Sequence, residues 1–268
     1  MKFGVLPVVT FGLFALVVAD RLSQAFASVD EPVVQGPSVT QPGSMVADPA
    51  GGAAAAPKPR GAAMAPSTPT IDRLARLAAR QHISREAGRT YLDSLIVSTD
   101  SMVRRWPDRT GAPLKVCLVE GGPSGYQPRM AQFAMDALYR WENTGMGVRF
   151  EAVKDTTEAD IVVRWINNFG LDRAGQTDLT WDQTGRVRKA VISLALRTNA
   201  GFPLPDVALV AVAVHEAGHA LGLPHSADSN DVMYPATRTG VLSERDRRTA
   251  QVLYQLQPGP VRDIGGTP

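Results

Sequence analysis

From Leu114 onward, some segments repeat hydrophobic residues with the period of a helix and others are strand-like apolar runs. This mixture is typical of a domain that contains both helices and strands. Runs rich in β-branched and aromatic residues predict five strands, at 114–120, 148–153, 161–166, 175–181 and 187–196. Between the first two, residues 127–143 carry apolar side chains at helical spacing, with Pro128 in the first turn. This segment is therefore predicted to be an amphipathic helix.

Two more helices are predicted in the C-terminal part of the chain. The first begins at Asp206, and because residues 207–214 are apolar on every face, it must be buried. The second begins at Ser243, whose spacing from Asp246 resembles a capping box. The order β-α-β-β-β-β-α-α predicts one α/β (α+β) domain over residues 106–260.

The N-terminal residues 1–27 have the pattern of an export segment. Met1 and Lys2 precede an uncharged apolar core, and Ala25-Phe26-Ala27 fits a small-x-small cleavage site. The core is also close to the length of a single membrane span, so an uncleaved anchor is the alternative. Both interpretations predict an extracytoplasmic protein that is either secreted or tethered to the membrane by this segment alone.

The segments that flank the predicted domain differ in composition. Residues 28–70 contain eight of the twenty prolines and predict a disordered linker. Residues 71–105 contain two short helical patterns, at 71–78 and 91–96, and are expected to be a pro-region or a stalk. The final residues, 261–268, are expected to be a flexible tail.

The composition limits which partners and which metal ligands the chain can use. The formal charge is +2, from 28 basic and 26 acidic residues, so a nucleic-acid partner is not expected. Seven basic residues stand against four acidic ones in 71–105, a charge run interpreted as a solvated face. The single cysteine, Cys117, excludes a disulfide scaffold and a cysteine-based zinc finger. Any metal site must therefore use His and carboxylate ligands.

Three of the four histidines fall within eleven residues. His215 and His219 are four residues apart on the predicted buried helix, so both imidazoles project from one face. Gly222 permits the left-handed conformation that ends the helix and lets His225 return to the same ion. Three neutral imidazoles leave a position open for water, as in catalytic zinc sites, and Glu216 is placed to reach that water without being a ligand.

These residues match HExxHxxGxxH, the extended zinc signature of the metzincin metalloproteases, and the sequel resembles the matrixin branch. The segment 231–235 is similar to the matrixin Met-turn. The resemblance implies a metzincin-like domain: a twisted five-stranded mixed sheet, three helices and a long buried active-site helix. Met233 would form a hydrophobic floor beneath the imidazoles, Tyr234 is not placed as an extra ligand, and Pro235 would line the S1′ pocket.

The resemblance further implies a monomeric zinc metalloendopeptidase with one catalytic Zn²⁺ and Glu216 as general base. A polypeptide substrate would add as an extended strand to the sheet edge near 175–181. Two alternatives remain. One is hydrolysis of another amide, such as a cell-wall peptide, and the other is a non-catalytic, zinc-stabilised adhesion module.

The chain also departs from the family pattern. A second, structural zinc would need further histidines, and only His82 remains, outside the predicted domain. No cysteine precedes the domain, so thiol-based latency is not expected. Ala236-Thr237 replaces the common Pro-x-Tyr, so side-chain specificity does not transfer. The sequence neither predicts nor excludes calcium binding, because scattered acidic residues such as Asp172 and Asp178 occur in any surface loop or strand end.

Overall fold

The computed structural model describes residues 8–13, 71–98, 101–109 and 111–262. The predicted linker, the predicted cleavage site and residues 263–268 of the predicted tail lie outside them. Among the described residues, no helix is both long enough and apolar enough to span a bilayer.

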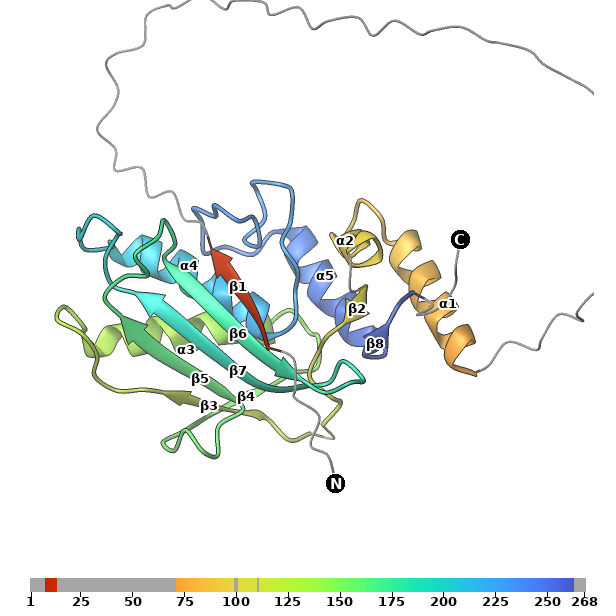
Figure 1. Ribbon diagram of the computed structural model, residues 1–268, viewed down its shortest axis with the longest axis horizontal. Coiled ribbons are helices and arrows are strands. Elements are labelled where there is room, and N and C mark those ends of the chain that lie inside the picture. The colour runs from red at the N-terminus through yellow and green to blue at the C-terminus, as the bar shows by residue number, and fades with distance from the viewer. Residues whose placement is uncertain (1–7, 14–70, 99–100, 110, 263–268) are drawn as a thin grey trace, which may run out of the picture. The chain divides into compact units, whose positions relative to one another are not determined.

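The centre of the fold is one mixed sheet in the order β1-β6-β7-β5-β3-β4 (Figure 1). The five predicted strands are confirmed as β3 Leu114–Leu118, β4 Phe150–Val153, β5 Ile161–Ile166, β6 Gly175–Trp181 and β7 Val187–Ala195. β3 is parallel to β4 and β5, β5 is parallel to β7, and β6 is antiparallel to β7. A sixth strand, β1 Val8–Leu13, comes from the predicted export segment and pairs antiparallel with β6.

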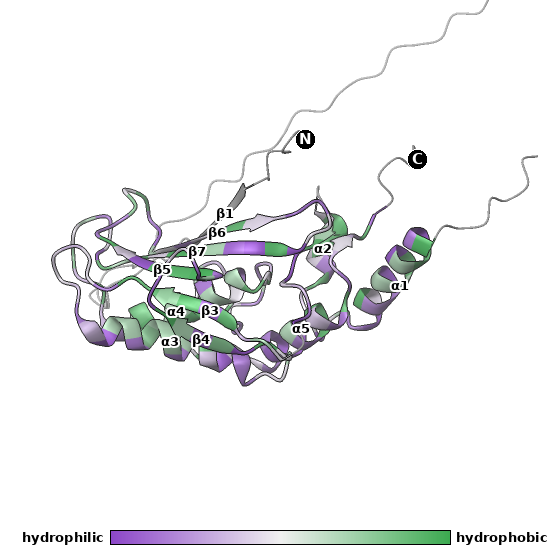
Figure 2. Ribbon diagram, turned by 90° about the horizontal axis from the view of Figure 1, so that it is seen from below, coloured by the Kyte–Doolittle hydropathy of each residue, from purple (hydrophilic) through white to green (hydrophobic). Residues whose placement is uncertain are grey.

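Two helices, α3 Pro128–Glu142 and α4 Asp206–Ala220, lie together on one side of this sheet (Figure 2). Trp141 joins them, because its indole N–H donates to the Val214 carbonyl at 2.8 Å from a fully buried position. From Ala211 to its end every residue of α4 is buried, whereas Val207, at the start of the apolar run that predicts a buried helix, is 70% exposed. The helix that carries the histidine pair is therefore held rigidly between α3 and the sheet.

The third predicted helix is α5, Glu244–Gln255. Its capping box is confirmed: the Ser243 hydroxyl accepts from the Asp246 N–H, and the Asp246 carboxylate accepts from the Ser243 N–H. After α5 the chain forms β8, Gly259–Pro260, which pairs antiparallel with β2, Met102–Val103. This pairing joins the C-terminal end of the domain to the segment that precedes it.

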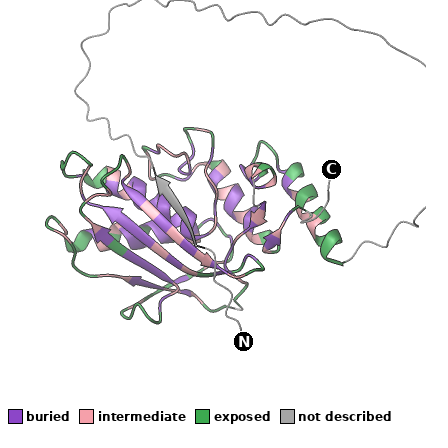
Figure 3. Cartoon of the chain, in the orientation of Figure 1, coloured by how far each residue is buried: buried purple, intermediate pink, exposed green. Residues whose placement is uncertain are grey.

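The residues before position 106 contribute to the same hydrophobic core as the sheet. Helix α1 spans Ile71–Arg85 and helix α2 spans Asp93–Val97. Much of α1 is exposed (Figure 3), but the core includes five buried side chains from this region: Ile83, Tyr91, Leu92, Leu95 and Val103. Buried side chains between residues 83 and 103 therefore pack in the same core as the predicted domain of residues 106–260.

The interpretation of the basic run as a solvated face is wrong for Arg105. Its side chain is only 2% exposed. The Nε atom donates to the Leu256 carbonyl at 2.7 Å, and Nη1 donates to Asp108 at 2.7 Å. Because a buried charge is stable only when it is paired and hydrogen-bonded, Arg105 ties the start of the domain to the end of α5.

Candidate active site

Helix α4 ends in a turn that sets the geometry of the histidine cluster. Gly222 has φ +96, which confirms the predicted left-handed conformation, and a Cβ there would overlap the Arg104 carbonyl oxygen. The Leu223 N–H donates to the Gly218 carbonyl at 3.1 Å and the Gly222 N–H to the His219 carbonyl at 2.9 Å. This pair of bonds is a Schellman motif, which reverses the chain directly after the helix.

The reversal brings His225 back to the two helical histidines. The ring centroids of His215 and His219 lie 4.7 Å apart, and that of His225 lies 5.3 Å and 4.6 Å from them. One ring nitrogen from each residue lies within 4.8 Å of the others. The Nε2 atoms of His219 and His225 are 3.1 Å apart, close to the separation of about 3.3 Å that Zn–N bonds of 2.0–2.1 Å impose in a tetrahedron.

Backbone carbonyls orient two of the imidazoles. His215 Nδ1 lies 2.7 Å from the Val232 carbonyl and His219 Nδ1 lies 2.9 Å from the Leu223 carbonyl, so Nδ1 carries the proton in each ring. His215 Nε2 is buried and has no hydrogen-bond partner among the described residues. A buried nitrogen lone pair without a donor, within reach of two further imidazoles, fits a metal ion.

Burial also keeps these side chains in the form that binds metal. Desolvation lowers the pKa of His215 to about 3, lowers that of His219 well below its usual range, and lowers that of His225 as well. Neutral imidazole is the form that binds a metal ion, so at neutral pH the folded chain has three imidazoles that can act as metal ligands.

Glu216 lies beside the histidines and is fully buried. The Thr177 hydroxyl, on β6, lies 2.7 Å from Glu216 Oε2 and 3.0 Å from the Glu216 carbonyl oxygen. The other carboxylate oxygen, Oε1, has no hydrogen-bond partner among the described residues. Burial raises the pKa of Glu216 to about 8, although the Thr177 hydrogen bond acts in the opposite direction. Such a pKa suits a group that exchanges a proton near neutral pH.

The first residue of β6 must be a glycine for Glu216 to fit. A Cβ at Gly175 would overlap both the Glu216 carboxylate and the Val212 side chain. The start of this strand therefore passes directly against the carboxylate.

Met233 is fully buried next to α4. A Cβ at Gly218 would overlap the Met233 sulfur, so the thioether packs against the α4 backbone between the two helical histidines. The Ser226 N–H donates to the Met233 carbonyl at 2.9 Å, which fixes the turn to the residue after His225. Tyr234 and Pro235 follow at partly exposed positions.

Sequence patterns did not identify several groups that support the site. The Trp106 indole N–H donates to the Ala220 carbonyl at 2.9 Å, and the Tyr254 hydroxyl donates to the Leu221 carbonyl at 3.1 Å. These bonds satisfy carbonyls that the last turn of α4 leaves without helical partners. Thr177, on β6, was missed as well, because no local pattern distinguishes one buried strand threonine from another.

A buried helix with an HExxH pair, a third histidine after a glycine turn and a methionine beneath them define a metzincin-type metallopeptidase domain. The sequence model of one family, described as Matrixin, matches residues 113–255. This is more than half of the chain, and the chain belongs to the matrixin family.

Three curated relatives share part of this region. Interstitial collagenase A from Mus musculus is 40% identical over 60 residues, which is 21% of this chain and 13% of the relative. Matrilysin from Felis catus is 44% identical over 55 residues, which is 20% of this chain and 18% of the relative. Matrix metalloproteinase-18 from Xenopus laevis is 31% identical over 104 residues, which is 37% of this chain and 18% of the relative. The matched stretches thus span less than a fifth of each relative.

Proposed function

We propose that this chain is an extracytoplasmic zinc metalloendopeptidase that hydrolyses polypeptides bound in an extended conformation. The observation that carries this proposal is the juxtaposition of three neutral imidazoles with the buried carboxylate of Glu216. His215, His219 and His225 would hold the ion. When bound, zinc supplies a Lewis acid that polarises the scissile carbonyl and makes water more acidic.

The chain itself supplies the proton transfers. Glu216 Oε1, which has no hydrogen-bond partner in the described part of the chain, would take a proton from the attacking water and give it to the departing amine nitrogen. Thr177 holds the other oxygen, Oε2, so the carboxylate has one fixed orientation during both transfers. In the metal-free chain burial raises the pKa of Glu216 to about 8, and this preference for the protonated form favours uptake of the proton from water.

The outer edge of β6 supports binding of a substrate strand. In the structure this edge pairs with β1 in antiparallel register, with Leu13 opposite Gly175 and Val8 opposite Thr180. Its backbone groups are therefore able to pair with an extended strand, and because β1 occupies this edge, a substrate would take the place of β1. Because Gly175 lies against Glu216, a peptide on this edge would pass close to the general base.

A test of this proposal compares the full-length chain with its Glu216→Gln variant on a quenched-fluorescence peptide library, with zinc content measured for both. The wild type should cleave, and chelation should abolish cleavage. The variant should retain one zinc and lose about 10²- to 10⁴-fold in kcat, the usual contribution of a general base. Equal cleavage by both proteins, or failure of the wild type to bind zinc under metal-replete conditions, would refute the proposal.

The alternative functions give different results in the same experiment. A hydrolase of cell-wall amides would retain zinc and leave the peptide library intact, but would cleave isolated peptidoglycan in a Glu216-dependent way. An adhesion module would retain zinc and cleave neither substrate. Among the described residues Glu216 Oε1 has no hydrogen-bond partner, which supports a catalytic role over this last alternative, because a purely structural carboxylate is ordinarily hydrogen-bonded when buried.

A further inference from the structure

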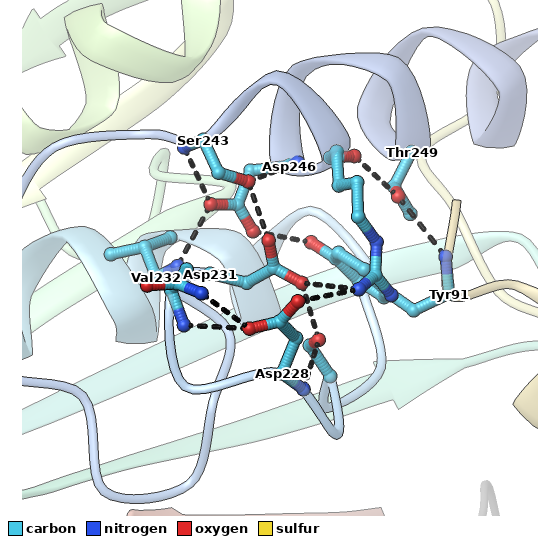
Figure 4. Close-up of polar contacts among 10 residues, drawn as sticks. Tyr91, Asp228, Asp231, Val232, Ser243, Asp246 and Thr249 are labelled. Carbon is cyan, nitrogen blue, oxygen red and sulfur yellow. Dashed lines mark hydrogen bonds and ion pairs between the residues drawn. The ribbon is translucent and has the colours of Figure 1, made fainter. Parts of the chain in front are cut away.

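A buried polar network connects the segment before α2, the Met-turn and the start of α5 (Figure 4). Tyr91 comes from the first of these, Asp231 and Val232 from the second, and Ser243 and Asp246 from the third. Tyr91 and Asp246 are separated by 155 residues, yet the Tyr91 hydroxyl donates to Asp246 Oδ1 at 2.9 Å. The function described above uses neither group.

Asp246 is the centre of this network and is fully buried. Its Oδ2 atom accepts the Val232 N–H at 2.8 Å and the Ser243 N–H at 2.9 Å, while Oδ1 accepts the Tyr91 hydroxyl. Burial raises the pKa of Asp246, and these three hydrogen bonds act against that rise. Burial also raises the pKa of the Tyr91 phenol well above its usual range, so the hydroxyl keeps its proton and remains the donor.

Val232 connects this network to the metal centre. Its N–H is held by Asp246, and its carbonyl is the partner of His215 Nδ1 at 2.7 Å. The carbonyl that orients His215 therefore belongs to a residue whose amide is fixed by the carboxylate that Tyr91 contacts. Outer groups of this kind orient ligating histidines and raise their basicity.

We propose that Tyr91 is a positioning residue for the metal centre, acting on His215 through Asp246 and the Val232 backbone. The inference rests on the proposed function only in taking His215 as a zinc ligand. It assigns the segment 71–98 a role as a built-in support of the site, in place of the removable pro-region or stalk expected from the sequence.

The packing of this segment supports that role. Ile83, Leu92 and Leu95 anchor it in the main hydrophobic core. The Tyr91 N–H lies 3.4 Å from the Thr249 hydroxyl of α5, so the residue is held at its backbone and at its side chain. A tyrosine held at both ends fixes the position of its hydroxyl relative to Asp246.

The decisive variant is Tyr91→Phe, which removes the hydroxyl and keeps the buried ring. The matched control is Glu86→Gln. Glu86 belongs to the same segment and pairs with Arg248 of α5, where Arg248 Nε donates at 3.0 Å, but Glu86 takes part in none of the Asp246 hydrogen bonds described above. The control therefore weakens the attachment of the segment to α5 without altering the path to His215.

The readout is the zinc dissociation constant of the full-length chain, measured by competition with a chromophoric chelator. Loss of a group that supports a metal ligand typically costs 10- to 100-fold in metal affinity, and Tyr91 acts through two further groups, so we expect about a tenfold rise for Tyr91→Phe. Glu86→Gln should stay within about twofold of the wild type. The visible absorption of the cobalt-substituted protein should change for Tyr91→Phe alone.

A merely structural role predicts a different result. It would lower the unfolding free energy of the metal-free and zinc-loaded proteins equally, which by linkage leaves the zinc dissociation constant unchanged. That result, or an equal loss of zinc affinity in the control, overturns the inference. In an Asp246→Asn background, Tyr91→Phe should have no further effect on zinc affinity, and an undiminished effect there would also overturn it.

The outcome is distinguishable from failure of the proposed function. If no peptide is cleaved but Tyr91→Phe still weakens zinc binding, the peptidase assignment fails and the positioning role stands. If peptides are cleaved and the zinc affinity of Tyr91→Phe equals that of the wild type, the positioning role alone fails.

Discussion

Replacing Thr177 by valine tests how the chain sets the basicity of its general base. Valine has nearly the shape of threonine and lacks the hydroxyl, so the strand and its packing are retained. The lost group is the fully buried hydroxyl that lies 2.7 Å from Glu216 Oε2. This hydrogen bond favours the ionised carboxylate, against the burial that raises its pKa to about 8.

The magnitude follows from the strength of that bond. A hydrogen bond to a charged group contributes about 1.5–3 kcal/mol, which corresponds to a rise of about 1–2 units in the pKa of Glu216. The base works when ionised, so activity increases as pH rises through its pKa. The acidic limb of the kcat/KM profile should therefore move upward by about 1–2 pH units in the variant, so that a loss of up to about 10- to 100-fold on that limb is recovered at higher pH.

The assay is kcat/KM against pH from 6 to 10 with a peptide substrate that the wild type cleaves. Thr180→Val is the matched control, because Thr180 lies three residues further along β6, on its opposite face. The control should keep the wild-type profile. If Thr177→Val also keeps the wild-type profile, the hydroxyl does not set the basicity of Glu216 and the reasoning is refuted.

Three further predictions concern stability and are measured by urea unfolding of the metal-free protein. Gly218→Ala should cost about 1–3 kcal/mol, because its Cβ overlaps the Met233 sulfur, and an unchanged midpoint would contradict that overlap. Trp106→Phe should cost about 1–3 kcal/mol by leaving the Ala220 carbonyl unpaired, and a neutral result would show that water replaces the indole. The pKa of His215 is lowered to about 3, so the unfolded chain takes up its proton first. Stability should therefore fall by up to about 1.4 kcal/mol per pH unit from this residue as pH drops below about 6.5. The measurement uses the Glu216→Gln variant, because the raised pKa of Glu216 contributes in the opposite sense over the same range, and constant stability of that variant down to pH 5 would contradict the burial of the imidazole.

The features that the sequence predicted are those fixed by neighbours in the chain. Helix α4 was predicted from an unbroken apolar run, and the return of His225 from Gly222, whose positive φ ends the helix. β5 and β6 have the bounds that their β-branched and aromatic residues indicate. In each case the determining interaction spans a few residues, so a local pattern carries the information.

The segment 71–98 shows why other parts could not be predicted in this way. The spacing of Ile71, Leu74 and Leu77 predicted a helix, and the helix is present, but all three side chains are exposed. The buried side chain of α1 is Ile83, near its other end. Periodicity indicates that a helix forms, while the face that packs depends on which distant residues complete the core.

The same distinction separates the chemistry of the site from its tuning. The histidines and Glu216 lie within eleven residues, because one helix and one turn suffice to bring them together. The groups that set their orientation and basicity come from Tyr91, Trp106, Thr177 and Asp246, which the fold brings together from across the chain. A short motif can therefore identify the reaction, whereas the zinc affinity and the pH dependence of the site are determined by contacts that only the complete fold creates. Substitutions at these four distant positions should accordingly change the metal affinity, stability or pH profile while leaving the motif intact.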